Sequence, residues 1–361
     1  MEQSVEVVPR RVLITGLSTF WGGRLAQLLE SDSRIEAVVG VDPDSPSRKL
    51  ERTEFVRVGP EHTAIERIIR AARIDTVVDT RMTLDPARIG KTAAHENNVI
   101  GTLNLLAACS VGGSPVRRVV FRSSGLFYGS SRSDPGYFSE SDPPPEKQST
   151  AIGRDLLEAE AAVAAFRSRR PEVSVTVLRF ADVLGPEVDS TMARYLSLPV
   201  VPSIAGFDPR LQFVDQEDAV HALGHAVSLG RSGAFNVAAD GVPVLSEVVS
   251  LLGRRPAPVI PPFGTAAAIS VARRLGLPFS EELSRQLRYG RAMDNRAFKA
   301  TGFHFRFTSR EAVLGLRNHL ILDPIVRGVS SPYRYEPEVE EFLRRSPLVE
   351  PTPRDPRSTG P

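Results

Sequence analysis

The sequence predicts an α/β fold in which a doubly wound parallel sheet carries a smaller C-terminal lobe. In the first half of the chain, short β-rich runs alternate with helical stretches, and the runs are continuous in Val, Ile and Leu. Such strands are buried on both faces, as in a parallel sheet covered by helices. After Pro186 the chain becomes irregular and proline-rich, which indicates a second lobe.

The elements of the sheet domain, residues 9–185, follow in order along the chain. The predicted strands are "RVLITG" (11–16), "IEAVVGVD" (35–42), "EFVRV" (54–58), "TVVDT" (76–80), "VRRVVFRSS" (116–124) and "VSVTVLRFADVLG" (173–185). The helices predicted between them cover 20–31, 62–73, about 86–108 and 151–166. In the last helix, apolar residues recur at three- and four-residue steps and share one face.

The remaining chain predicts a lobe, a return to the sheet and a tail. Residues 186–210 and 241–327 form the expected lobe, with short helices near 265–275, 280–288 and 309–320. Between the two parts, residues 211–240 read as strand, helix and strand and are expected to complete the main sheet. Residues 328–361 are rich in Pro, Arg, Glu and Ser, which predicts a disordered tail.

Composition excludes several classes of function. The chain of 361 residues has 45 basic and 43 acidic residues, a balance that argues against a nucleic-acid partner. No uncharged apolar run approaches the roughly 20 residues of a membrane-spanning helix. The single cysteine, Cys109, permits no intrachain disulfide, and the N-terminus lacks the order of a signal peptide. We expect a cytoplasmic protein without a membrane partner.

A glycine-containing turn predicts a phosphate site. "ITGLSTFWGG" (14–23) lies where the first strand turns into a helix, so that backbone N–H groups and the helix dipole can hold a pyrophosphate. Asp42 ends the second strand, where an acid meets an adenosine ribose hydroxyl and favours NAD over NADP. The pattern therefore predicts a dinucleotide, with NAD favoured and NADP left open.

The turn resembles the T-G-x-x-G-x-x-G loop of the NAD-dependent epimerase/dehydratase family, a branch of the extended short-chain dehydrogenases/reductases. Thr15, Gly16 and Gly22 match this loop, and Thr19 replaces its middle glycine. Further segments match family motifs in order: "ENNVIGTLNLLAAC" (96–109), "SSGLFYG" (123–129), "LRFADVLGP" (178–186), "RLQFVDQEDAV" (210–220) and "GAFNVAADG" (233–241). The resemblance covers about residues 11 to 320 and is to the UDP-glucose 4-epimerase type.

The resemblance implies a Rossmann-type fold, a nucleotide-sugar ligand, and a homodimer paired through helices 87–108 and 153–170. It also implies site residues. Ser124 matches the catalytic hydroxyl, and the implied cofactor-binding residues are Thr15, Gly16, Thr19, Phe20, Gly22, Asp42 and Asn98.

The family's acid/base dyad is missing. The chemistry needs Tyr-x-x-x-Lys, because residues four apart share a helix face and the lysine lowers the pKa of the tyrosine. Aligning "AIGRDLLEAE" on that motif places Ile152 on the tyrosine and Leu156 on the lysine, with Glu160 on the trailing glutamate. No Tyr-x-x-x-Lys occurs anywhere in the chain. Aliphatic carbons exchange no proton, so the usual hydride-transfer mechanism lacks its base.

Other departures surround the expected cofactor. Gly59 replaces an aspartate that contacts adenine, and Arg81 and Met82 replace small residues that line the dinucleotide. A β-branched Thr19 is expected to crowd the pyrophosphate. Together these residues predict a reshaped site.

Substitute catalytic groups are not evident in the sequence. Asp155, Lys147 and Tyr137 are candidates for the missing base, and we interpret each as a solvated surface residue. His221 and His225 are four apart, but without a third ligand they predict a structural or solvent-facing pair and no metal site.

The sequence therefore favours an NAD(P)-binding protein in which the standard epimerase chemistry is lost or altered. Two alternatives stay open: an active nucleotide-sugar epimerase or reductase with a replacement base, and a non-catalytic structural or interaction protein with a closed site.

Overall fold

The computed structural model describes residues 10–59, 61–85, 89–145, 148, 150–259 and 280–326. The strands of the main sheet are β1 (Arg11–Thr15), β2 (Ala37–Asp42), β3 (Thr53–Arg57), β4 (Thr76–Asp79), β5 (Arg118–Ser124), β6 (Ser174–Phe180) and β10 (Gly233–Val237). The helices around them are α1 (Phe20–Glu30), α2 (His62–Ala71), α4 (Lys91–His95), η1 (Glu96–Ile100), α5 (Gly101–Ser110), η2 (Gly125–Tyr128), α6 (Ala151–Arg169) and α8 (Gln216–Leu229).

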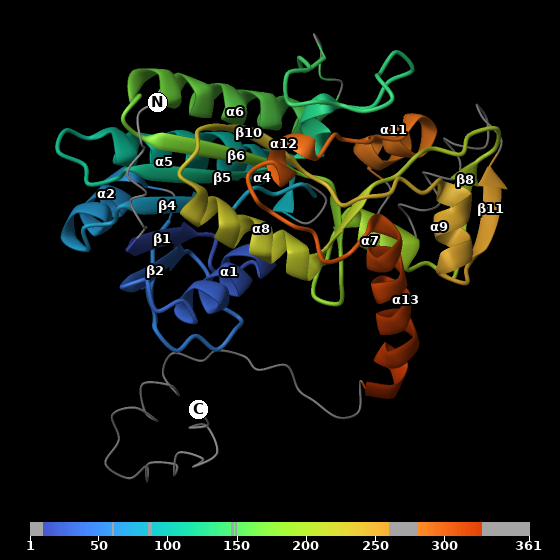
Figure 1. The fold of residues 1–361 in the computed structure, drawn as a ribbon, viewed down its shortest axis with the longest axis horizontal. Helices are drawn as coiled ribbons and strands as arrows, with labels where there is room; N and C mark the ends of the chain where they lie inside the picture. The colour runs from blue at the N-terminus through green and yellow to red at the C-terminus, as the bar shows by residue number, and fades with distance from the viewer. Residues whose placement is uncertain are drawn as a thin grey trace.

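The seven strands form one parallel sheet in the order β10-β6-β5-β4-β1-β2-β3. Helices cover both faces (Figure 1): α1 and α8 share one hydrophobic core with the sheet, and α2, α5 and α6 share the other. The predicted doubly wound α/β fold is confirmed. Because the strand order reverses at β1, the carboxyl ends of β1 and β4 flank the point where such folds bind ligands.

The predicted strand over 173–185 is two strands. β6 ends at Phe180, and β7 (Asp182–Leu184) leaves the main sheet to pair with β9 (Phe213–Asp215). Residues 211–240 are expected from the sequence to complete the main sheet with two strands. Only the second of them, β10, joins it, because β9 pairs with β7 instead. A continuous apolar run predicts burial but not pairing partners, so it does not reveal where a chain changes sheets.

Within the predicted helix over about 86–108, α4 begins at Lys91, after Gly90 with φ of 85°, and residues 86–88 lie outside the described residues. The chain then runs through a π-helical turn at Glu96–Ile100 before α5 begins at Gly101. Such turns widen the helix locally and are frequent at functional sites. Here the turn lies beside the residues that follow β4, because Asn98 in the turn is hydrogen-bonded to the backbone of Thr83.

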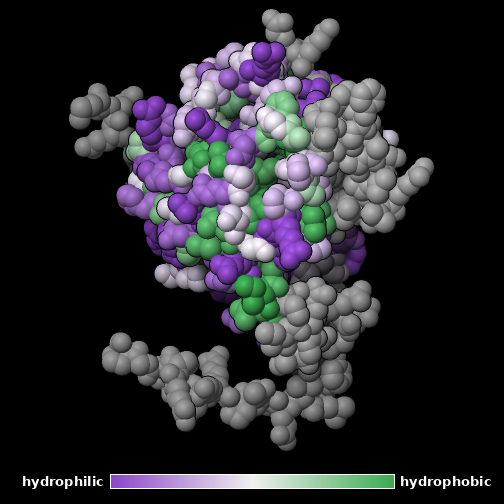
Figure 2. Space-filling model, turned by 90° about the vertical axis from the view of Figure 1, so that its right-hand side faces the viewer, coloured by the Kyte–Doolittle hydropathy of each residue, from purple (hydrophilic) through white to green (hydrophobic). Residues whose placement is uncertain are grey.

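The smaller lobe has its own hydrophobic core. Its elements are β7, β9, α7 (Thr191–Leu196), β8 (Val200–Ile204), α9 (Leu245–Leu251), β11 (Arg255–Val259), α11 (Glu281–Tyr289) and α13 (Ser309–Val326), with α12 (Arg296–Lys299) packed under β10. On the face in Figure 2, hydrophilic and hydrophobic residues are interspersed. The predicted helix near 265–275 and the predicted tail at 328–361 lie outside the described residues, within which no helix is long and apolar enough to cross a membrane.

Helix α6 turns its apolar face fully inward. Ile152 and Leu156 are both 0% exposed and belong to the core shared with α2 and α5, where Met82 and Phe121 also lie. The two positions that align with the family's dyad are therefore tightly packed hydrocarbon.

We predict that Leu156→Ala lowers the free energy of unfolding by about 2–5 kcal/mol, because it removes buried methyl groups and leaves a cavity. Leu322→Ala, at a side chain that is 52% exposed on α13, serves as the control and should change stability by less than about 0.5 kcal/mol. Urea denaturation followed by circular dichroism measures both. Equal, small effects would contradict the placement of Leu156 in the core.

Candidate functional site

The turn after β1 has the geometry of a phosphate loop. Gly16 has φ of +80°, and a Cβ on Gly22 would collide with the Gly16 carbonyl oxygen, so both positions require glycine. Thr19 is accommodated without strain, at φ of −77°. Its hydroxyl donates to the Gly16 oxygen (2.7 Å) and accepts from the Gly22 N–H (3.1 Å), which caps α1. The side chain expected to crowd the cofactor thus supports the loop, although it engages one N–H of the first helical turn.

Asp42 is held against this loop. Its carboxylate accepts hydrogen bonds from the N–H (3.0 Å) and hydroxyl (2.9 Å) of Ser18 and from the N–H of Asp44 (2.9 Å). The acid at the end of β2 is therefore next to the phosphate loop, where a ribose-binding acid is expected. At Gly59, by contrast, a Cβ would meet nothing within 4 Å.

Arg81 fills the space between the carboxyl ends of β1 and β4. Its guanidinium makes two hydrogen bonds to Asp79 (3.0 and 2.8 Å), and Nε also donates to the hydroxyl of Thr15 (3.2 Å). The side chain lies over two glycines. A Cβ on Gly16 would be 3.0 Å from Cγ of Arg81, and a Cβ on Gly101 would collide with Nη1. Only 12% of the Arg81 side chain and 3% of the Asp79 side chain are exposed.

The charge of Asp79 is stabilised by this arrangement. Burial alone would raise its pKa, but the Arg81 guanidinium and the hydrogen bonds from Arg81 and Thr15 hold the pKa below its ordinary value. Asp79 is a site residue that sequence reasoning missed. The signal available in the sequence was an acid and an arginine two positions apart at the end of a predicted strand.

A second buried arginine lies nearby on β5. Arg122 donates to the Met82 carbonyl oxygen, and its guanidinium carbon is 4.5 Å from the ring centre of Trp21, in the first turn of α1. Nε of Arg122 has no hydrogen-bond partner among the described residues. Burial lowers the pKa of Arg122 to about 9, opposed in part by the charge of Asp79. The cleft therefore contains two cations that sequence reasoning did not place together.

The strand end that carries Ser124 is fixed by side-chain hydrogen bonds. The Ser124 hydroxyl accepts from the Leu126 N–H (3.2 Å) and caps η2, while the neighbouring Ser123 hydroxyl donates to Glu160 (2.5 Å). Glu160 is paired with Arg179 in a buried ion pair (2.7 Å). Thus the trailing glutamate of the motif is present and structural, while the dyad before it is replaced.

The same arginine connects the strand end to the edge of the sheet. Arg179 donates to the Tyr128 hydroxyl (2.8 Å), which itself donates to the side chain of Asn236 in β10 (2.8 Å). The guanidinium carbon of Arg179 also lies 3.6 Å from the ring centre of Phe127. Burial raises the pKa of Tyr128, partly offset by Arg179. A tyrosine so held keeps its proton near neutral pH and is unsuited to replace the missing base.

The three side chains that could replace the missing base differ in their surroundings. Asp155 is buried on α6 and its carboxylate is 2.8 Å from Nδ1 of His95. The surface position expected for Asp155 is therefore wrong, because the helix turns this carboxylate toward a histidine. Tyr137 is 52% exposed and faces solvent, as expected, and Lys147 lies outside the described residues.

Asn98 and His225 have structural contacts. The amide of Asn98 accepts from the Thr83 N–H (2.8 Å) and donates to the Thr83 carbonyl oxygen (2.9 Å), so it fixes the segment after β4. His225 contacts the Thr301 hydroxyl (2.9 Å), and Asp218 accepts from two backbone N–H groups. His225 thus has a structural contact, and Asp218 fixes the segment at Arg306 and Phe307.

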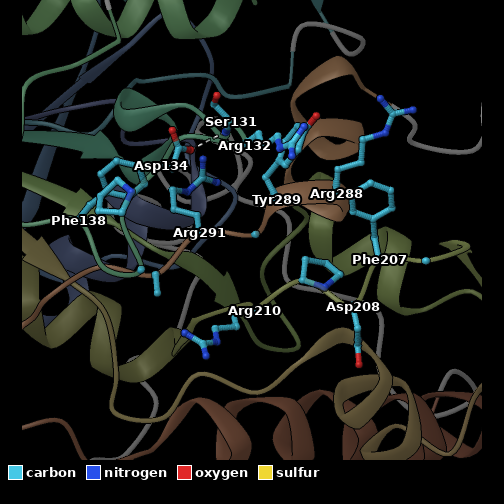
Figure 3. Close-up of a pocket in the computed structure, with 16 residues that line it drawn as sticks. Ser131, Arg132, Asp134, Phe138, Phe207, Asp208, Arg210, Arg288, Tyr289 and Arg291 are labelled. Atoms are coloured by element: carbon cyan, nitrogen blue, oxygen red, sulfur yellow. Dashed lines mark hydrogen bonds between the residues drawn. The ribbon is translucent and has the colours of Figure 1, made fainter.

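A cavity of about 660 Å³ lies between the sheet domain and the lobe (Figure 3). Four arginines from three segments of the chain line it, together with two partly exposed aromatic rings; they are Arg132, Arg210, Arg288, Arg291, Phe207 and Tyr289. Its acids, Asp134 and Asp208, already accept hydrogen bonds from Ser131 and Ser246. An excess of cations beside aromatic rings suits an anionic ligand with a planar ring.

Asp182, which replaces the asparagine of the family motif, lies next to this cavity. It is half-buried and accepts from Nε2 of Gln286, and the charge of Arg291 faces it. Burial raises the pKa of Asp182 against these two partners. The substitution therefore comes with its own compensating groups from the lobe.

Comparisons with known proteins agree with this geometry. Residues 12–238 match the family model described as the NAD dependent epimerase/dehydratase family, and the chain belongs to that family. An uncharacterised protein of Mycobacterium tuberculosis is 40% identical over 314 residues, which cover 84% of this chain and 82% of the relative. An uncharacterised protein of Mycobacterium bovis matches to the same extent.

Solved structures share the fold. MoeE5 in complex with UDP-glucose and NAD is 25% identical, with a TM-score of 0.65 over 89% of this chain and 100% of that chain. The UDP-glucose 4-epimerase of Thermotoga maritima, solved with UDP-glucose, has a TM-score of 0.67 at 20% identity over 87% of this chain and 99% of that chain. The predicted family and fold are thus confirmed.

The residues present fit the family's cofactor only in part. The phosphate loop and Asp42 have the expected shape, whereas Arg81 occupies the space where the strand order reverses. Ile152 and Leu156 offer no titratable atom beside it. The site thus has the glycine turn and the acid of the motif, while its dyad positions carry aliphatic side chains.

We predict that Asp155→Asn lowers the pKa of His95. The hydrogen bond that His95 donates to the Asp155 carboxylate raises this pKa above its ordinary value. The pair therefore stabilises the fold at pH values below about 6.5, and this contribution is lost as the pH rises through the raised pKa. NMR titration of the imidazole ring measures the shift. The control Glu158→Gln, on the same helix, should lower the pKa of His95 less. If Asp155→Asn leaves the pKa of His95 unchanged, the two side chains are not paired and Asp155 is free to act as a base.

Proposed function

We propose that this protein binds a nicotinamide dinucleotide, with NAD favoured over NADP, and a nucleotide sugar, without the standard epimerase turnover. Family membership and the phosphate loop support the dinucleotide. The observation that carries the proposal is the packing of Ile152 and Leu156, both 0% exposed, into the core at the dyad positions. A binding or sensing role follows from a site with ligand-binding parts and no acid/base pair.

Thr15, Gly16, Thr19, Phe20, Gly22 and Asp42 are the residues that would hold the cofactor. When bound, the nicotinamide supplies hydride transfer in this family. In this chain, the loop would orient the pyrophosphate through the N-terminus of α1, and Asp42 would accept a ribose hydroxyl. Asn98 would act indirectly, by fixing the segment after β4.

The arginine-lined cavity supports a nucleotide-sugar ligand. Its charge suits a diphosphate, and Phe207 and Tyr289, with ring centres 6.3 Å apart, offer faces for a planar base. Ser124 lies at the end of β5 and would offer its hydroxyl to a sugar or ribose. UDP-glucose is bound by the similar structure MoeE5, which makes it the natural first probe.

We predict that the purified protein binds NAD and UDP-glucose in calorimetric titrations but does not interconvert UDP-glucose and UDP-galactose. The physical reason is the absence of a group that can take the sugar hydroxyl proton. Epimerisation that Ser124→Ala abolishes would instead establish an enzyme with a replacement base. If neither NAD, NADP nor UDP-glucose binds, a structural or interaction protein is the better description.

A matched pair of variants controls the titration. Arg132→Ala/Arg210→Ala removes two cations from the cavity and should weaken UDP-glucose binding by about tenfold or more, because hydrogen bonds to charged groups are strong. NAD binding should be unchanged. Arg70→Ala, which breaks a surface ion pair with Glu66 on α2, should affect neither ligand.

We also propose a homodimer paired through α5 and α6. Ile100, which directly precedes α5, and Leu103 in its first turn are 44% and 46% exposed. The neighbouring helix α6 packs beside α5 and has exposed alanines at 161, 164 and 165. Such an apolar face is unusual for a surface that stays in water.

Sedimentation equilibrium is expected to give twice the 39.4 kDa chain mass. Leu103→Lys should yield a monomer, because it places a charge in the interface. Leu322→Lys on α13 should remain dimeric. A monomeric wild-type protein at micromolar concentration would contradict the proposal.

A further inference from the structure

The space at the reversal of strand order is occupied by the protein itself. Arg81 extends from the end of β4 across Gly16 of the phosphate loop to Gly101 at the start of α5. Both glycines are needed for this, since a Cβ at either position would press on the arginine. A dinucleotide that crosses the sheet at this point must share the same space.

The side chain is held there by specific contacts. Asp79 accepts from Nε and Nη2 of Arg81, from its backbone N–H (3.2 Å) and from the Thr15 hydroxyl (2.8 Å). The pair is largely withdrawn from solvent, so its charge interaction is weakly screened. Rotation of Arg81 out of this position leaves Asp79 with the Thr15 hydroxyl and the nearby charge of Arg122.

We propose that the Arg81–Asp79 ion pair is a latch that closes the dinucleotide cleft and thereby sets its affinity for the cofactor. The inference rests on the proposed function, because it concerns the same dinucleotide site. A ligand that binds only when Arg81 has moved has its apparent affinity reduced by the fraction of molecules that are open. The dissociation constant for NAD is thus higher than the phosphate loop alone would give.

The test compares two double variants with the wild type. Asp79→Asn/Arg81→Ala removes both charges and the bulk of Arg81, whereas Asp79→Asn/Arg81→Met removes the charges but keeps an unbranched side chain. Changing Asp79 together with Arg81 avoids leaving a buried carboxylate unpaired. Trp21 is the sole tryptophan and lies in the first turn of α1, so its fluorescence reports binding of NAD or ADP.

The alanine variant is expected to bind NAD and ADP about tenfold more tightly or better, corresponding to a latch closed in about nine molecules of ten or more. The methionine variant has lost the ion pair but keeps an unbranched side chain in the cleft, so it should bind NAD more tightly than the wild type and less tightly than the alanine variant. A gain in affinity is a readout that mere loss of stability cannot produce. Arg296→Ala is the matched control, since Arg296 makes a pair of the same two-residue spacing with Asp294 but is 88% exposed.

Three results would overturn the latch. If the alanine variant binds NAD equally or less tightly than the wild type, Arg81 is a neutral neighbour or a phosphate ligand, and the proposed function stands. If the methionine variant binds NAD no more tightly than the wild type, the ion pair does not hold the cleft closed, and only the bulk of Arg81 matters. If wild type and variants all fail to bind NAD, NADP and ADP, the proposed function falls and the latch falls with it.

Discussion

Parallel pairing of seven strands is the constraint on which the rest of the structure depends. Because β1, β4, β5 and β6 run in the same direction, their carboxyl ends meet along one edge of the sheet. The loop after β1, Arg81 after β4 and Ser124 at the end of β5 all lie along this edge. The fold therefore brings together residues that are more than 100 positions apart in the sequence.

At this edge, side chains of the protein itself occupy positions that align with the family's cofactor-lining and dyad residues. Arg81 and Asp79 fill the gap beside β1, Arg122 covers Trp21, and aliphatic side chains of α6 fill the dyad positions. The phosphate loop and the Glu160–Arg179 pair nevertheless keep their geometry. This arrangement is consistent with the proposed binding role, because the groups that would hold the ligands also stabilise the fold.

The changes occur together with compensating partners. Asp182 is accompanied by Gln286 and Arg291, and Arg81 by Asp79. Thr19 gains a capping role that a glycine could not provide. A buried charge without such partners would be strongly unfavourable, so each substitution is tolerable only in the context of its neighbours.

The sequence alone determined the fold class, the family, the phosphate loop and the missing dyad, because these depend on local periodicity and on motifs of fixed spacing. Tertiary structure decided what the motifs leave open. It split the strand predicted over 173–185, gave Thr19 a cap in place of a clash, and turned Arg81 toward Asp79 and away from solvent. Such outcomes depend on which groups lie across from one another in space, and neither periodicity nor spacing encodes that.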